Sequence, residues 1–179
     1  MNQNSKIKPD IIIVDDHLIF RQGLKAIINY EDVGNVIAEA SNGEEFLELL
    51  PSLKPDLVLM DIDMPLMNGF EATEKALELM PGLKIIAFTV FSEEEYYERM
   101  FKIGARGLIL KSSGFNELEI AIEIVMSGKS YFKGKFEMEE NSDSMINEIT
   151  TGSKNDLTSK KRKMLFFPWV ANRKNCMQQ

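Results

Sequence analysis

The sequence has 179 residues, of which 44% are hydrophobic and 27% charged, and a formal net charge of −7, which is typical of a globular domain with an additional segment. No apolar run is long enough to span a bilayer and the first residues lack the apolar core of a signal peptide, so we expect a cytoplasmic protein without a membrane segment. The single cysteine, Cys176, excludes an internal disulfide and a metal site made of cysteines.

Short β-branched runs alternate with longer amphipathic segments in the first part of the chain. Strands are predicted over residues 10–15, 34–39, 56–61, 84–89 and 107–110. Helices are predicted over residues 17–30, 43–51, 67–80, 92–103 and 115–127. Strands that alternate with helices form parallel sheets covered on both faces, so the pattern predicts an α/β domain with a doubly wound (βα)₅ sheet.

The composition changes after this predicted domain, which we place at residues 9–130. Residues 131–155 contain many polar and charged residues and few large apolar ones, which is typical of a linker. In residues 156–179, Pro168 is expected to end a predicted helix after about two turns. A segment of about 20 residues cannot bury a core alone. We therefore expect a linker followed by an incomplete helical tail.

Polar residues stand at the ends of four of the predicted strands. Asp15 and Asp16 end the first strand, Asp61 the third, Thr89 the fourth and Lys111 the fifth. The carboxyl ends of parallel strands meet at one edge of the sheet, where open α/β sheets bind their ligands. We therefore expect these five side chains to converge. Each alone is more often a cap or turn residue, and only their joint order favours a functional site.

The three carboxylates predict a particular chemistry at this edge. Packed together they repel one another, so protons or a divalent cation must neutralise them. Hard oxygen ligands suit Mg²⁺ better than zinc or copper. Asp61 would then attack phosphorus as a carboxylate nucleophile and form an acyl phosphate. Lys111 would pair with the phosphoryl oxygens, and the Thr89 hydroxyl would donate a hydrogen bond to another of them.

These residues resemble a known pattern. About residues 9–128 resemble the receiver domain of bacterial two-component response regulators, which has a flavodoxin-like fold. The resemblance rests on the acid pair at 15–16, the block D-x-D-M-P-x-M-N-G at 61–69, the threonine at 89 and the lysine at 111. It implies that Asp61 accepts a phosphoryl group from a sensor histidine kinase. It implies no other enzyme activity than self-phosphorylation and slow self-dephosphorylation on this residue.

The resemblance also implies a magnesium site and a partner. Asp16, Asp61 and the backbone carbonyl of Asp63 would bind Mg²⁺, with Asp15 assisting. The family further implies a homodimer that forms on phosphorylation. His17, the only histidine, is interpreted as a helix-start residue. Leu108 stands where the family usually has an aromatic switch residue, so the usual aromatic rotation is not expected.

The residues from Asp15 to Leu24 resemble the LuxR-type (NarL/FixJ) subgroup, whose members regulate transcription by binding DNA. Residues 157–162 resemble the opening of its helix-turn-helix output domain, but no recognition helix follows. We therefore expect residues 156–179 to be the remnant of a truncated or frameshifted output domain. The basic run at 160–163 would then make only non-specific phosphate contacts.

Two alternatives stay open at this point. One is a stand-alone receiver that acts through protein contacts only. The other is a haloacid-dehalogenase-like phosphatase, whose signature also begins with the Asp-x-Asp pattern of Asp61 and Asp63. That signature stands on the first strand and continues with Thr or Val, whereas here the pattern follows the third strand and continues with Pro65.

Overall fold

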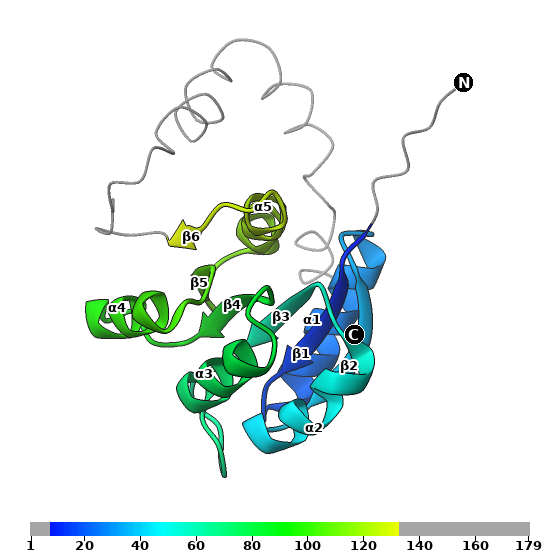
Figure 1. Cartoon of the computed structure of the whole chain (residues 1–179). Helices are drawn as coiled ribbons and strands as arrows, with labels where there is room; N and C mark the ends of the chain where they lie inside the picture. The colour runs from blue at the N-terminus through cyan, green and yellow to red at the C-terminus, as the bar shows by residue number, and fades with distance from the viewer. Residues whose placement is uncertain (1–7, 133–179) are drawn as a thin grey trace, which may run out of the picture. The chain divides into compact units, whose positions relative to one another are not determined.

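The computed structural model describes residues 8–132, which form a six-stranded parallel sheet flanked by five helices (Figure 1). The strands are β1 Asp10–Val14, β2 Asn35–Ala40, β3 Leu57–Met60, β4 Lys84–Thr89, β5 Gly107–Leu110 and β6 Tyr131–Phe132. The helices are α1 Leu18–Tyr30, α2 Gly43–Leu53, α3 Gly69–Leu79, α4 Glu94–Ile103 and α5 Phe115–Met126. The strand order is β2-β1-β3-β4-β5-β6. The predicted flavodoxin-like order is thus confirmed for the first five strands.

The helices cover the two faces of the sheet in separate groups. α1 and α5 pack against one face, and α2 and α3 pack against the other, with α4 beside α3 (Figure 1). β3 is buried at all four of its positions. β1 is buried everywhere except at its first residue. Their continuous apolar runs are therefore explained by central strands that are covered on both sides.

A sixth strand extends the sheet beyond the predicted domain. Tyr131 and Phe132 pair with Gly107 and Leu108, although the predicted linker began at residue 131. The backbone nitrogen of Tyr131 donates a hydrogen bond to the carbonyl oxygen of Arg106 over 2.8 Å. Two residues are too few to show the alternation that marks a strand, so the sequence carried no signal for β6. The remaining linker and tail predictions lie outside the described residues.

The helices begin within two residues of their predicted starts. The side chain of Asn42 caps α2 by accepting a hydrogen bond from the backbone nitrogen of Glu45 over 3.0 Å. Asn68 caps α3 in the same way. α4 begins two residues later than predicted, after Glu93 rather than at Ser92. Among the described residues, no helix has the length and apolar character needed to cross a membrane.

Candidate functional site

The structure brings the predicted polar residues together at one edge of the sheet. Asp15 follows β1, Asp61 follows β3, Thr89 ends β4 and Lys111 follows β5. Asp15, Asp61 and Thr89 are buried. Because adjacent parallel strands end at the same edge, four segments distant in sequence contribute to one small polar site.

Lys111 lies between the two buried carboxylates. Its Nζ is 2.5 Å from Oδ2 of Asp61 and 2.6 Å from Oδ2 of Asp15, and its side chain is only 10% exposed. The Phe20 ring, whose centroid is 4.8 Å from Nζ, covers the ammonium from the side of α1. One cation therefore partly neutralises two acids in a place from which water is largely excluded.

The backbone holds Asp61 in place. Its amide donates to the carbonyl oxygen of Val14 over 2.8 Å, which ties the end of β3 to β1. Its Oδ1 accepts a hydrogen bond from the backbone nitrogen of Ile62 over 2.8 Å, while Oδ2 faces Lys111. Burial raises the pKa of the Asp61 carboxyl above its ordinary value, and the hydrogen bond and charge of Lys111 oppose this rise. Lys111 thus favours the ionised form, which is the nucleophilic one.

The loop after Asp61 returns to the same point. The amide of Gly69 donates to the carbonyl oxygen of Ile62 over 2.9 Å. A Cβ at Gly69 would collide with the backbone oxygen of Asp61. Only glycine permits this close approach, which explains sterically why the 61–69 block ends in Gly69.

Four side chains could hold a cation. Asp15, Asp16, His17 and Asp61 each offer a ligand atom, and these atoms lie within 4.8 Å of one another. The three carboxylates suit a hard cation with several waters, as Mg²⁺ requires. The Asp16 side chain is 31% exposed, whereas Asp15 is buried against Lys111. The Asp63 side chain is exposed and outside this group, which leaves only its backbone carbonyl for the predicted role.

His17 has a second feature besides its position at the helix start. It precedes α1 as the capping residue, in agreement with the interpretation of the sequence. Its Nδ1 also lies 2.9 Å from Oδ1 of Asp16 and 3.4 Å from Oδ1 of Asp15. This contact was not anticipated, because the spacing of the residues gave no indication of how the exposed ring is oriented.

Thr89 and Lys111 are connected through adjacent strands. The amide of Lys111 donates to the carbonyl oxygen of Thr89 over 2.7 Å. The Thr89 hydroxyl oxygen accepts a hydrogen bond of 3.3 Å from the backbone nitrogen of Phe91. Leu108, at the position of the missing aromatic, is fully buried in an apolar cluster with Ile62. The only hydrogen bond of the Thr89 hydroxyl within the described residues therefore leads toward α4, not toward β5.

Sequence reasoning missed Arg21. Its guanidinium donates a hydrogen bond from a terminal nitrogen to the backbone carbonyl of Asp15, and its Nε lies 3.3 Å from Oε2 of Glu39 in β2. The available signal was an arginine in the first turn of the helix that follows the acid pair. The long-range contact with Glu39 cannot be read from local spacing.

Comparisons with known proteins agree with this fold. Residues 11–123 match the response regulator receiver domain family. The chain therefore belongs to the two-component response regulators, and its described residues form the receiver domain. It is similar to the transcriptional regulatory protein DegU of Brevibacillus brevis, with 36% identity over 135 residues that cover 75% of this chain and 56% of DegU. It is also similar to the oxygen regulatory protein NreC of Staphylococcus aureus, with 34% identity over 170 residues that cover 90% of this chain and 76% of NreC.

Solved structures lead to the same family. A LuxR-family two-component response regulator from Aurantimonas sp. SI85-9A1 superposes with a TM-score of 0.67 at 33% identity, over 69% of this chain and 89% of that one. A DNA-binding response regulator of the LuxR family from Staphylococcus aureus superposes with a TM-score of 0.63 at 26% identity, over 66% of this chain and 98% of that one. The chain spans just over half the length of DegU, so the similarity to DegU concerns part of a longer protein.

Proposed function

We propose that this receiver accepts a phosphoryl group on Asp61 from a sensor histidine kinase. The observation that carries the proposal is the position of Lys111, whose Nζ lies within 2.6 Å of carboxylate oxygens of both Asp61 and Asp15. A cation at this place counters the effect of burial on the Asp61 pKa and is available to the incoming phosphoryl oxygens.

The proposed reaction is a displacement at phosphorus. A carboxylate oxygen of Asp61 forms a bond to phosphorus while the bond between phosphorus and the donor's imidazole nitrogen breaks. The imidazole keeps the electron pair and takes a proton from water. Lys111 and the Thr89 hydroxyl would each bind a phosphoryl oxygen in the product. We propose no other enzymatic activity than this transfer and slow hydrolysis of the resulting acyl phosphate.

We also propose that the acids at this edge hold Mg²⁺. Asp16, Asp61 and the carbonyl of Asp63 would be the direct protein ligands, with Asp15 assisting. The mixture of carboxylate and carbonyl oxygens fits the preference of this ion. When bound, Mg²⁺ supplies positive charge next to the phosphoryl oxygens, so that three neighbouring acids no longer disfavour an anionic substrate.

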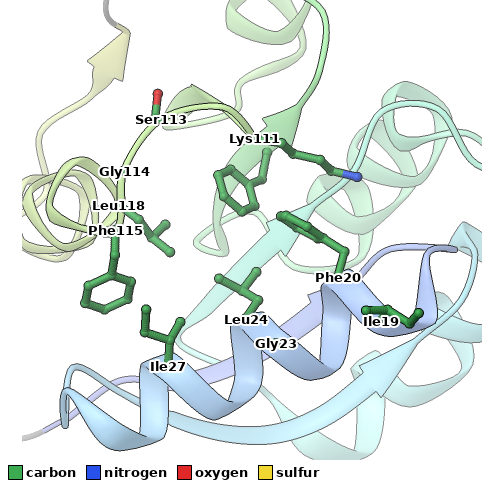
Figure 2. Close-up of a pocket in the computed structure, with 11 residues that line it drawn as sticks. Ile19, Phe20, Gly23, Leu24, Ile27, Lys111, Ser113, Gly114, Phe115 and Leu118 are labelled. Atoms are coloured by element: carbon green, nitrogen blue, oxygen red, sulfur yellow. The ribbon is translucent and has the colours of Figure 1, made fainter. Parts of the chain in front are cut away.

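A groove beside the site supports the assignment of the donor. A cavity of about 420 Å³ lies between α1 and the segment from Lys111 to Leu118, and most of the residues that line it are apolar (Figure 2). Ile19, which lines this cavity, is 87% exposed. Exposed apolar surface of this kind often marks a protein interface. We propose that the sensor histidine kinase contacts this groove when it donates its phosphoryl group.

For the output we propose regulation of transcription. DegU is a transcriptional regulatory protein by name, and a solved relative is a DNA-binding regulator of the LuxR family. The match to NreC covers 90% of this chain, which is more than residues 1–132 can supply, so the similarity continues into the residues that follow the receiver. Phosphorylation would promote a homodimer in the cytoplasm, where response regulators usually act. No finding favours the stand-alone receiver or the phosphatase alternative.

A phosphorylation assay tests the proposal. The chain is incubated with acetyl phosphate and Mg²⁺, and its intact mass is measured. We expect the addition of one phosphate that hydroxylamine removes, as it does from acyl phosphates. Asp61→Asn should abolish the addition, and Asp63→Asn is the matched control that should retain it, because the Asp63 side chain is exposed and only its carbonyl is assigned a role. Undiminished labelling of Asp61→Asn would refute the proposal.

A further inference from the structure

Arg21 connects the acid pair to the rest of the fold. It lies in the first turn of α1, and its side chain is only 12% exposed. A terminal guanidinium nitrogen donates to the carbonyl oxygen of Asp15, and Nε donates to Oε2 of Glu39 over 3.3 Å. Glu39 stands on β2, next to β1 in the sheet. One side chain therefore joins the β1–α1 loop to the neighbouring strand.

The hydrogen bond from Arg21 acts on the peptide that joins Asp15 to Asp16. The peptide unit is planar, so the carbonyl oxygen of Asp15 and the Cα of Asp16 belong to one rigid group. Holding this oxygen therefore restricts the position of the Asp16 Cα in the loop that follows β1. The Asp15 side chain is held separately, by Lys111 at 2.6 Å and by the backbone nitrogen of His17 at 2.8 Å.

Asp16 itself has few restraints. Its side chain is 31% exposed and contacts the exposed ring of His17 at 2.9 Å. A partly exposed imidazole is a mobile support for a metal ligand. The guanidinium of Arg21 is held by Glu39. It restrains the loop of Asp15 and Asp16 more firmly than the imidazole does, because the guanidinium is planar and its donors point in fixed directions.

The Glu39 carboxylate that holds the guanidinium of Arg21 is ionised. Lys25, one turn after Arg21 on α1, donates to Oε1 of Glu39 over 2.7 Å, while Arg21 binds Oε2. The hydrogen bond from Lys25 is the largest cause that lowers the pKa of the Glu39 carboxyl, with a smaller contribution from Arg21. The carboxylate therefore stays ionised and holds the guanidinium in place.

We infer that Arg21, oriented by Glu39, is a positioning residue that aligns Asp16 for Mg²⁺. This inference rests on the magnesium site proposed above. In this role Arg21 strengthens Mg²⁺ binding, whereas its positive charge alone would weaken it. Removing a positive charge near a dication site should by electrostatics alone tighten Mg²⁺ binding. Removing a positioning residue should weaken it, because partners that orient metal ligands typically contribute about 10–100-fold to affinity.

The test compares two variants that lose the same charge. Arg21→Gln and Lys25→Gln each remove one cation from the same helix and one partner from Glu39, but only Arg21 contacts the acid-pair loop. Mg²⁺ binding is measured by calorimetry with the full chain. We expect the dissociation constant of Arg21→Gln to rise about 10–100-fold and that of Lys25→Gln to stay the same or fall. An equal change in both variants would overturn the inference.

Arg21→Lys separates geometry from charge. The single ammonium group of lysine cannot reproduce the two directed contacts of the guanidinium with the Asp15 carbonyl and with Glu39. We therefore expect weaker Mg²⁺ binding although the charge is kept. The half-saturating Mg²⁺ concentration for phosphorylation by acetyl phosphate should rise, whereas the rate at saturating Mg²⁺ should recover. In the metal-free protein, amide hydrogen exchange at residues 15–17 should become faster. Wild-type affinity in both Arg21 variants would overturn the inference.

Glu39→Gln covers the case in which the Arg21 variants fail to fold. It keeps the arginine but removes its charged anchor, so we expect a smaller loss of Mg²⁺ affinity in the same direction. Unchanged affinity in this variant would then overturn the inference. If the wild-type chain itself bound no Mg²⁺, the proposed metal site would fail, and the inference about Arg21 would fall with it.

Discussion

The two halves of the candidate site are built by different means. On the β1 and β3 side, buried carboxylates are held by short charged contacts, such as the pairs of Lys111 with Asp15 and Asp61 at 2.6 and 2.5 Å. On the β4 and α4 side, the Thr89 hydroxyl accepts a hydrogen bond of 3.3 Å from the amide of Phe91, whose ring stacks on Tyr96. We propose that the first, charged half performs the chemistry and that the second, responsive half changes its contacts when Asp61 is phosphorylated.

The largest expected effect comes from Lys111→Met, which removes the cation shared by both buried acids. We expect the rate of phosphorylation by acetyl phosphate to fall about 10²–10³-fold, as when one preorganised donor to a developing charge is lost. Without Lys111, burial acts on the pKa of Asp61 with less opposition, so less of the nucleophilic form is present.

The control for this variant is Lys102→Met, which removes an exposed lysine that pairs with Glu98 on α4 at 3.0 Å. It should react like the wild type, because exposed pairs one helical turn apart contribute little. Initial rates at saturating Mg²⁺ decide the matter. A Lys111→Met rate close to that of the control would contradict the assignment of chemistry to this half of the site.

A smaller effect should separate the two acids of the pair. Asp16→Asn should weaken Mg²⁺ binding more than Asp15→Asn, because Asp16 is accessible whereas Asp15 is buried against Lys111. For Asp15→Asn we expect a loss of about 10–100-fold, which is typical of a residue that supports direct ligands. Calorimetric titration of both variants measures the difference. Wild-type affinity in both would exclude the metal site.

The sequence predicted more of the charged half of the site than of the responsive half. The acids and Lys111 stand at the ends of apolar runs, and the topology of a parallel sheet requires such ends to meet. The stack of Phe91 on Tyr96 depends on where α4 begins, and the prediction of that start was two residues too early. Arg21 was missed for a similar reason, since its partner Glu39 is distant in sequence.

Local signals were also overruled by packing. The predicted helix 43–51 ended at Pro51, but α2 continues through this proline to Leu53. A proline near the end of a helix removes only one backbone hydrogen bond, and the burial of Phe46 and Leu50 on the same helix outweighs this loss. β6 was too short to be recognised by alternation. The errors therefore concern element ends and contacts distant in sequence rather than the order of the elements.

A smaller effect is expected in the pH dependence of stability, which tests the burial of the Asp61 carboxyl in the charged half. The pKa of Asp61 is raised above its ordinary value of 3.8, mainly by burial. The folded state therefore binds this proton more tightly than the unfolded chain does. Metal-free protein should lose stability as the pH rises from about 3.8 through the folded pKa, because ionisation then costs more in the folded state.

Asp61→Asn should remove this contribution. The difference in the free energy of unfolding between variant and wild type, measured with urea in the presence of a chelator, should grow in favour of the variant as the pH rises through this window. Asp63→Asn, at an exposed position, should follow the wild type. A difference that stays constant with pH would indicate that the burial of Asp61 is compensated fully by Lys111.

The smallest expected effect tests the responsive half. Phe91 stacks on Tyr96 with ring centroids 4.5 Å apart and planes 5° from parallel, and Tyr96 in turn stacks on Phe70 at 5.9 Å. The backbone of Phe91 donates to the Thr89 hydroxyl, which would turn to a phosphoryl group on Asp61 and give up this bond. Leu108 is buried and not aromatic, so we propose that this stack carries the change from Thr89 to α4.

A double-mutant cycle with Phe91→Ala and Tyr96→Ala measures the strength of that route. In the unphosphorylated protein we expect a coupling energy of about 0.5–1.5 kcal/mol from urea unfolding, as for other aromatic pairs. With Mg²⁺ and beryllofluoride as a phosphoryl mimic, the coupling should fall because the segment from Thr89 to Phe91 is pulled toward Asp61. The pair of Phe101 in α4 and Phe132 in β6, with ring centroids 5.5 Å apart, is the matched control and should keep its coupling. Equal coupling of Phe91 and Tyr96 with and without the mimic would mean that the response reaches α4 by another path. The assignment of the response to the segment from Thr89 to Tyr96 would then be wrong.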